Sequence, residues 1–147
     1  MSKRRNDLGG SKDKRVKQDD EESRLFQDKE HHSSVLSNMQ QSREEGEFID
    51  VSVVVGKKKF EAHRIVLKSA IPYFQAMFSK DFVERNERVI ELKENVVDES
   101  AFEILIGYAY TGQIRITSSN VQNLMIGANF LGITSACGKC MCRISCV

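Results

Sequence analysis

The sequence predicts one α+β domain in which short helices outnumber the strands of a small sheet. Two patterns carry this prediction. Valines alternate over 51–55 as in a strand with one buried face, and apolar residues in several other segments recur at the three- and four-residue spacing of a helix face. With 147 residues and 40% hydrophobic composition, the chain can bury a core without metal or disulfide staples.

A first helix is predicted over 33–45, because Val35, Leu36 and Met39 share one helix face and Gly46 supplies a stop. This face is unusually apolar for an element that precedes the core. It therefore needs a partner surface, either on a second protein or on the core of its own chain.

Strands are predicted where β-branched residues gather. A hairpin is expected with strands over 48–55 and 60–62, around a turn that begins at Gly56. Two brief strands are expected further along the chain, over 89–92 and 114–117.

Four more helices are predicted from their end signals. Pro72 stands where a first helical position opens a helix, Asp98 and Asn120 are N-cap residues, and Gly112 and Gly132 end the last two helices. We expect these helices over 63–69, 73–78, 98–112 and 120–132.

Five blocks of sequence keep one order and spacing along the chain: Asp50-Val51; Phe60-Glu61-Ala62-His63-Arg64 with Val66-Leu67; Tyr73-Phe74-Gln75-Ala76-Met77-Phe78; Tyr108-Ala109-Tyr110-Thr111-Gly112; and Asn120-Val121-Gln122-Asn123-Leu124. Together they resemble the BTB/POZ domain of kelch-like proteins, over about residues 35–133. The resemblance implies the α+β BTB/POZ fold, a helical cluster flanked by a small β-sheet, in a dimer of the domain-swapped type.

The resemblance also implies a dimer interface. Val35, Leu36 and Met39 would pack across a two-fold axis against their own copies in the other protomer. Asp50 and Arg64 match the acidic and basic positions that line the pocket shared by BTB dimers, where each would compensate the other's charge. The alternative is that Asp50 only caps a strand end and Arg64 faces water.

In kelch-like proteins this domain is the cullin-3 docking end of a ubiquitin ligase. The pattern to look for is a hydrophobic residue, any residue and then glutamate, after the 73–78 helix, and Phe82-Val83-Glu84 fits it. Phe82 would fill an apolar pocket on the cullin, while Glu84 would form charge-assisted hydrogen bonds at its rim. Alternatively, Phe82 packs under its own loop.

The ends of the chain differ from the middle. We expect a disordered charged tail over 1–24, the BTB/POZ domain over 25–136 with an incomplete final helix that Gly138 weakens, and a divergent cysteine-rich tail over 137–147. The cytoplasm is the expected location. Nuclear import stays open because Lys14-Arg15-Val16-Lys17 looks like an import signal.

Two departures from the family pattern stand out. Ile71 replaces the serine that usually caps the helix of the Pro-Tyr-Phe triplet, a loss of typically about 1 kcal/mol. The BACK region and kelch propeller do not follow Ile133, so the sequence resembles a truncated or short isoform. As a hypothesis, such a product could pair with full-length relatives and occupy cullin without delivering a substrate.

The cysteine tail is too compact to indicate a metal site. Cys137 and Cys140 have zinc-knuckle spacing, but the four cysteines leave little loop to build a tetrahedron around. We expect no metal and no cofactor. Adventitious metal binding and redox chemistry remain as alternatives to a tail without a role.

Composition and motifs favour a protein-interaction adaptor over an enzyme. No catalytic constellation is recognisable, the net charge is +1, and no apolar run is long enough to span a membrane. The expected partners are a second BTB protein, in a homodimer or heterodimer, and cullin-3, with no nucleic acid and no membrane. A BTB domain that recruits corepressors for a transcriptional regulator, or a non-functional isoform, is the alternative.

Overall fold

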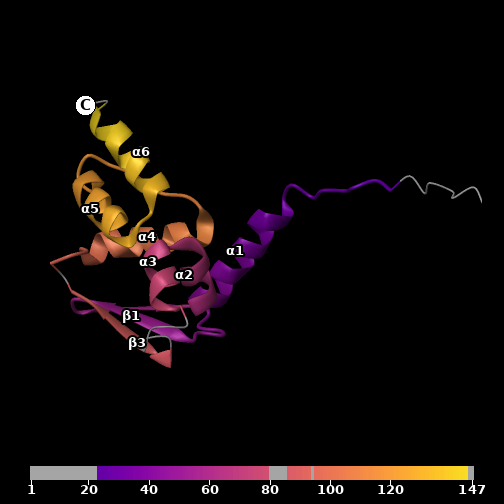
Figure 1. Cartoon of the computed structure of the whole chain (residues 1–147), viewed down its shortest axis with the longest axis horizontal. Coiled ribbons are helices and arrows are strands. Elements are labelled where there is room, and N and C mark those ends of the chain that lie inside the picture. The colour runs from indigo at the N-terminus through magenta and orange to yellow at the C-terminus, as the bar shows by residue number, and fades with distance from the viewer. Residues whose placement is uncertain (1–22, 80–85, 94, 146–147) are drawn as a thin grey trace, which may run out of the picture.

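The computed structural model describes residues 23–79, 86–93 and 95–145, and it confirms the α+β prediction. Helices gather on one side of a small sheet, and residues 23–30 lead away from the body of the fold beyond the first helix (Figure 1). In chain order the elements are α1 (His31–Glu44), β1 (Val51–Val55), β2 (Lys58–Ala62), α2 (Arg64–Ala70), α3 (Pro72–Met77), β3 (Val89–Leu92), α4 (Glu99–Thr111), α5 (Val121–Leu131) and α6 (Thr134–Ser145).

The sheet has the strand order β2-β1-β3. β1 and β2 form the predicted antiparallel hairpin, with Val53 opposite Phe60, and the turn places Gly56 at φ 59°. β1 and β3 are parallel, with Val53 opposite Ile90, because α2 and α3 lie between them in the chain and form the crossover. The alternating valines of β1 are fully buried, as their spacing predicted.

The core lies between the sheet and α4. Phe60 of the hairpin meets Phe102 of α4 edge to face, with ring centroids 5.0 Å apart. α5 packs closely on α4 because Gly127 has no side chain: a Cβ there would lie 3.0 Å from Leu105 Cδ1. The largest fully buried side chains are Tyr110, Phe74, Phe102, Leu67, Ile71, Leu105, Ile106, Leu124 and Leu131, with the valines of β1.

Most predicted helix ends are confirmed. Asp98 caps α4, with its side chain accepting a hydrogen bond of 3.1 Å from the N–H of Ala101. Pro72 opens α3. Gly112 and Gly132 end α4 and α5 in the left-handed conformation, at φ 67° and 75°, which glycine adopts without steric cost.

The predicted strand over 114–117 is wrong, because the structure describes this segment without strand pairing. Strand propensity is realised only where a partner strand lies alongside, and the described sheet ends at β2 and β3. Asn120 does not cap α5 with its side chain as predicted. Its amide instead closes the preceding loop, accepting from the N–H of Thr117 at 2.8 Å and donating to the carbonyl of Arg115 at 3.1 Å.

The prediction of an incomplete final helix is also wrong. α6 continues through Gly138 to Ser145, so residue 137 falls inside a helix. A glycine costs roughly 1 kcal/mol in a helix interior, and the packing of α6 against α5, with Ala136 buried in the core, offsets this cost.

The part of the chain that the structure describes has no group of three or more metal-ligating side chains placed to hold an ion. None of the helices described is long and apolar enough to cross a membrane.

Ile71 illustrates how the core overrides a capping preference. The residue stands at the N-cap position of α3, without a side-chain cap, and its side chain is buried. We expect Ile71→Ser to lower the free energy of unfolding, because losing a buried isoleucine costs roughly 2–5 kcal/mol whereas a new cap contributes only about 1 kcal/mol.

Urea denaturation of the whole chain would measure the change, with Ile71→Val as the control that keeps most of the buried volume. A serine variant as stable as the wild type would contradict this account of Ile71.

Candidate protein-interaction surface

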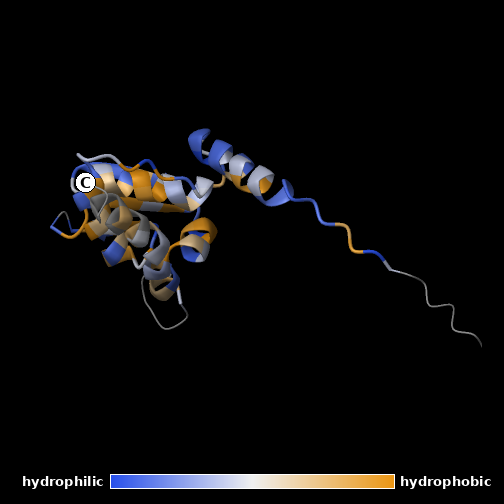
Figure 2. Ribbon diagram, turned by 90° about the horizontal axis from the view of Figure 1, so that it is seen from above, coloured by the Kyte–Doolittle hydropathy of each residue, from blue (hydrophilic) through white to orange (hydrophobic). Residues whose placement is uncertain are grey.

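α1 is the one described helix that buries none of its side chains. Its apolar residues Val35, Leu36 and Met39 remain 37–39% exposed. Figure 2 shows α1 beside the rest of the fold, with hydrophilic residues over most of its surface. The three apolar residues form the face predicted from the sequence, and because each is still partly exposed, the rest of the chain covers this face only in part.

A charged side chain holds the C-terminal end of α1 to the fold. Arg43 Nε donates to the carbonyl of Glu61 in β2 at 2.7 Å, and its guanidinium lies 5.2 Å from the centroid of the Tyr110 ring. This attachment positions the apolar face of α1 opposite α2 without burying it.

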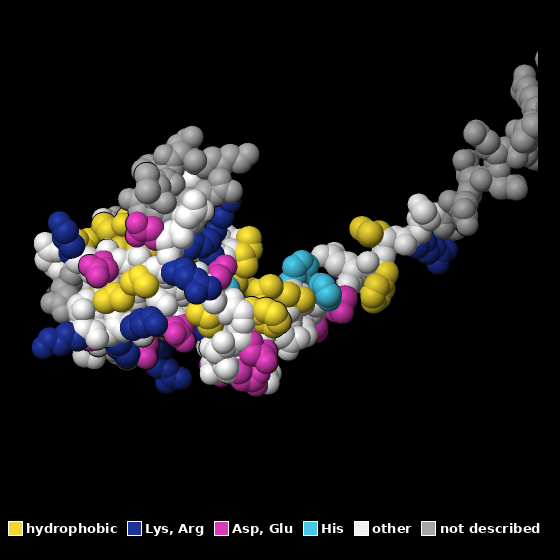
Figure 3. Space-filling model, turned by 90° about the horizontal axis from the view of Figure 1, so that it is seen from below, with side chains coloured by type: hydrophobic (Ala, Val, Ile, Leu, Met, Phe, Trp, Pro, Cys, Tyr) yellow, Lys and Arg dark blue, Asp and Glu magenta, His cyan; other side chains and the backbone are white. Residues whose placement is uncertain are grey.

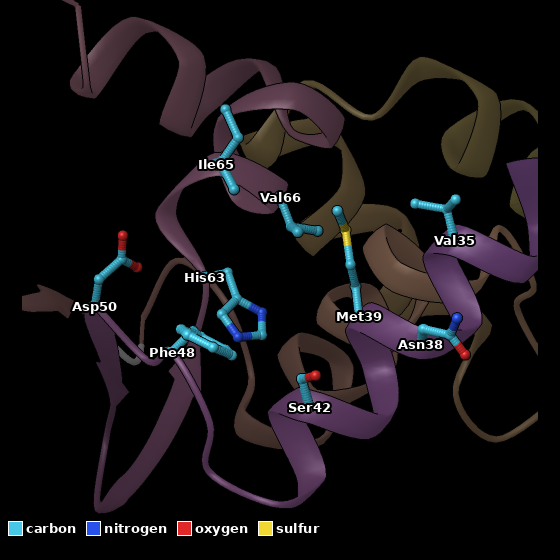
Figure 4. A pocket seen from close by; sticks show the side chains of 9 residues that line it. All are labelled: Val35, Asn38, Met39, Ser42, Phe48, Asp50, His63, Ile65 and Val66. Atoms are coloured by element: carbon cyan, nitrogen blue, oxygen red, sulfur yellow. The ribbon is translucent and has the colours of Figure 1, made fainter.

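Between α1 and α2 lies an apolar groove of about 420 Å³, which Figure 4 shows from close by. A second hollow of about 360 Å³ shares Met39, Ile65 and Val66 with this groove. The groove is lined by Val35, Asn38, Met39, Ser42, Phe48, Asp50, His63, Ile65 and Val66.

Buried hydrogen bonds fix the floor of the groove. The Tyr110 hydroxyl accepts from the backbone N–H of His63 at 2.8 Å and lies 3.0 Å from His63 Nδ1, while His63 Nε2 lies 2.8 Å from the carbonyl oxygen of Glu47. All these contacts are satisfied together when Tyr110 donates to Nδ1 and the Nε2–H donates to Glu47. Burial raises the pKa of the Tyr110 hydroxyl above its already high usual value, so the hydroxyl stays protonated over a wider range of pH.

Asp50 and Arg64 lie together at one end of the groove. Asp50 Oδ1 accepts from the backbone N–H of Arg64 at 2.6 Å, so the carboxylate caps the first turn of α2. The Arg64 guanidinium lies 4.5 Å from the centroid of the Phe78 ring and donates to the carbonyl of Glu87. The alternative, in which Asp50 caps a strand end and Arg64 only faces water, does not describe these contacts.

These two residues also line a more polar hollow of about 510 Å³, which adjoins the apolar groove through Asp50 and Ile65. The adjacent charged and apolar surfaces together form one candidate interface. That a second protomer shares it remains a prediction.

The other predicted site falls outside the described residues. Phe82 and Glu84 lie between the end of α3 and the point where the description resumes at Asn86, so their role in cullin binding stays a prediction.

Sequence reasoning missed Phe48 and the bonds of Tyr110. The strand was predicted to begin at Phe48, but β1 begins at Val51, and Phe48 has the positive φ of 54°. Only Gly46, two residues earlier, marked the segment as a turn. Nothing in the sequence near Tyr110 indicated a bond to a residue 47 positions away.

The fold and this surface define a protein-interaction domain, and comparison with known proteins agrees. The BTB/POZ domain family model matches residues 39–144. The chain is 34% identical over 110 residues to Kelch-like protein 28 of Homo sapiens and of Mus musculus, and 35% identical over 106 residues to Kelch-like protein 8 of Caenorhabditis elegans.

These alignments cover 75% and 72% of this chain, but only 19% and 15% of the two kelch-like relatives' lengths, respectively. The solved BTB domain of zebrafish PATZ1 superposes with a TM-score of 0.75 at 27% identity, covering 85% of this chain and 100% of that one. This chain belongs to the BTB/POZ domain family, and its sequence relatives are kelch-like proteins.

Removing the Tyr110 hydroxyl tests the floor of the groove. We expect Tyr110→Phe to lower the free energy of unfolding by about 1–3 kcal/mol, because the buried N–H of His63 loses its acceptor. The matched control is Tyr108→Phe, which removes an exposed hydroxyl contact and should change stability by less than about 0.5 kcal/mol. A Tyr110→Phe variant as stable as the wild type in denaturant titrations would show that the buried network adds no stability.

Proposed function

We propose that this BTB domain is a dimerising adaptor that pairs with a second BTB domain through α1 and docks cullin-3 through the segment after α3. The exposed apolar face of α1 carries the proposal. A domain of this family acts through protein contacts, and this face borders a groove lined by further apolar side chains of α2.

The competing interpretation was that Val35, Leu36 and Met39 only cover their own core. The structure argues against it, since more than a third of each side chain stays exposed. Contact with a second copy would remove this remaining apolar area from water, which stabilises association. A two-fold arrangement is the simplest one, because the same patch then serves both partners.

Exchange of N-terminal segments would extend this contact. Residues 23–28 have no regular secondary structure, and Leu25 and Phe26 are almost wholly exposed. A second chain could bury both side chains, as a domain-swapped dimer requires.

Docking to cullin-3 rests on sequence and position. Phe82-Val83-Glu84 follows α3, in the place that the kelch-like resemblance assigns to the docking pattern. A large apolar side chain with an acid two residues later suits a contact in which the ring fills a pocket and the carboxylate bonds at its edge.

A charge on the α1 face should abolish pairing. The double variant Leu36→Glu with Met39→Glu is expected to be a folded monomer at concentrations where the wild type is a dimer, because two carboxylates would be desolvated in the contact. Sedimentation velocity measures the mass, and circular dichroism verifies the fold.

Ser37→Glu is the control, since it adds a carboxylate to the opposite face of α1 and should leave the dimer intact. A wild type that stays monomeric at its highest soluble concentration, although well folded, would overturn the pairing.

Cullin docking is tested separately by affinity capture. Phe82→Ala should reduce the cullin-3 retained by the purified dimer at least about tenfold, as expected for loss of an anchor side chain. Val83→Ala is the control at the intervening position and should retain cullin at the wild-type level. Equal retention by Phe82→Ala and the wild type would sink the cullin assignment.

A further inference from the structure

The loop that joins α4 to α5 presents three consecutive hydroxyl side chains. Residues 113–120 form no helix or strand, and Thr117, Ser118 and Ser119 are all exposed. The hydroxyl oxygens of Thr117 and Ser119 lie 3.0 Å apart and share a hydrogen bond. The Ser118 hydroxyl bonds to none of the residues that the structure describes. Ser118 is therefore the member of this group whose oxygen is available to react.

A cationic side chain precedes this serine by three positions. Arg115 is exposed and forms no ion pair with another described residue. Among the arginines whose side chains the structure describes, it alone has a serine or threonine two or three positions after it. Kinases select substrates by the charges beside the acceptor hydroxyl. A guanidinium suits those with an acidic substrate groove, because it forms paired hydrogen bonds with a carboxylate.

The overall charge of the chain gives such a kinase little help. The net charge is +1, and on the face that Figure 3 shows, Lys and Arg side chains are scattered among Asp and Glu. The whole-molecule field therefore steers an acidic groove only weakly, and recognition depends on the arginine next to the acceptor.

Few hydrogen bonds hold the loop in its present conformation. The Asn120 side chain accepts from the N–H of Thr117 at 2.8 Å and donates to the carbonyl of Arg115 at 3.1 Å, and both bonds are exposed. Water can replace exposed bonds of this kind, so a kinase can draw the segment into an extended form at small cost. Ile116 and Val121 pack against the core on either side of the hydroxyl group, which confines the opening to the loop.

We propose that Ser118 is a phosphorylation site for a serine kinase that selects a basic residue before the acceptor. In the reaction, Ser118 Oγ forms a bond to the γ-phosphorus of ATP while the bond from that phosphorus to the β,γ-bridging oxygen breaks. ADP leaves with the electron pair, and the hydroxyl proton passes to the catalytic carboxylate of the kinase. The product is a phosphoserine with a charge of about −1.5 to −2 at pH 7.

The surroundings of Ser118 favour this negative charge. The first N–H groups of a helix have no intrahelical acceptor, and Asn120 at the N-cap of α5 does not bond to them through its side chain. A phosphate two residues before this N-cap is attracted by the positive end of the helix dipole and by the Arg115 guanidinium.

Incorporation of phosphate tests the site. The purified whole chain is incubated with ATP, Mg²⁺ and the catalytic subunit of cyclic-AMP-dependent protein kinase, and mass spectrometry with peptide fragmentation should place a phosphate on Ser118. Ser118→Ala should leave this loop unmodified. The matched control is Ser119→Ala, which removes a neighbouring hydroxyl and should keep the phosphate. A wild-type loop that stays unmodified, or that carries phosphate on Thr117 or Ser119 instead, would overturn the assignment.

Recognition of the arginine is measured by the rate. Arg115→Gln should lower kcat/KM for phosphorylation of Ser118 at least about tenfold, because the guanidinium contact with the kinase is lost. The loop keeps its bond to residue 115, which uses the backbone carbonyl. Arg115→Lys retains the charge and should restore part of the rate. Equal rates for Arg115→Gln and the wild type would show that the arginine does not direct the kinase, and the kinase class would be wrong.

The phosphorylated chain should also unfold at a higher urea concentration than the unmodified chain, and high salt should reduce this difference because it screens the phosphate. Unfolding at the same or a lower urea concentration would contradict the stabilising contact with α5.

Discussion

The hydroxyl of Tyr110 makes the contacts on which the candidate interaction surface depends. It ties α4 to His63, whose ring in turn contacts the carbonyl of Glu47, so one buried tyrosine connects the core to the loop before β1. The same ring lies under the Arg43 guanidinium that attaches α1. Both walls of the groove therefore depend on contacts with one residue of the core, Tyr110, and burial raises the pKa of its hydroxyl.

This arrangement separates stability from recognition. The core formed by β1, α4 and α5 is closed and apolar, and α1 adds no buried residue to it. A helix that contributes so little to its own core can present its apolar face to another protein at small cost to folding.

The BTB/POZ match accounts for most of the chain, and the kelch-like relatives share this region although it spans less than a fifth of their lengths. Ile71 shows how one member can depart from the family pattern, because a buried apolar side chain outweighs a missing cap.

The sequence by itself determined the elements whose signals are local. Alternating valines, the Asp98 cap and the terminal glycines act within a few residues, and the apolar face of α1 was visible for the same reason. Tertiary structure alone decided that 114–117 stays unpaired, that Asn120 closes a loop, that α6 passes through Gly138, and that Phe48 leaves the strand. In each case a residue could satisfy more than one local preference, and contacts with segments distant in the chain selected the conformation.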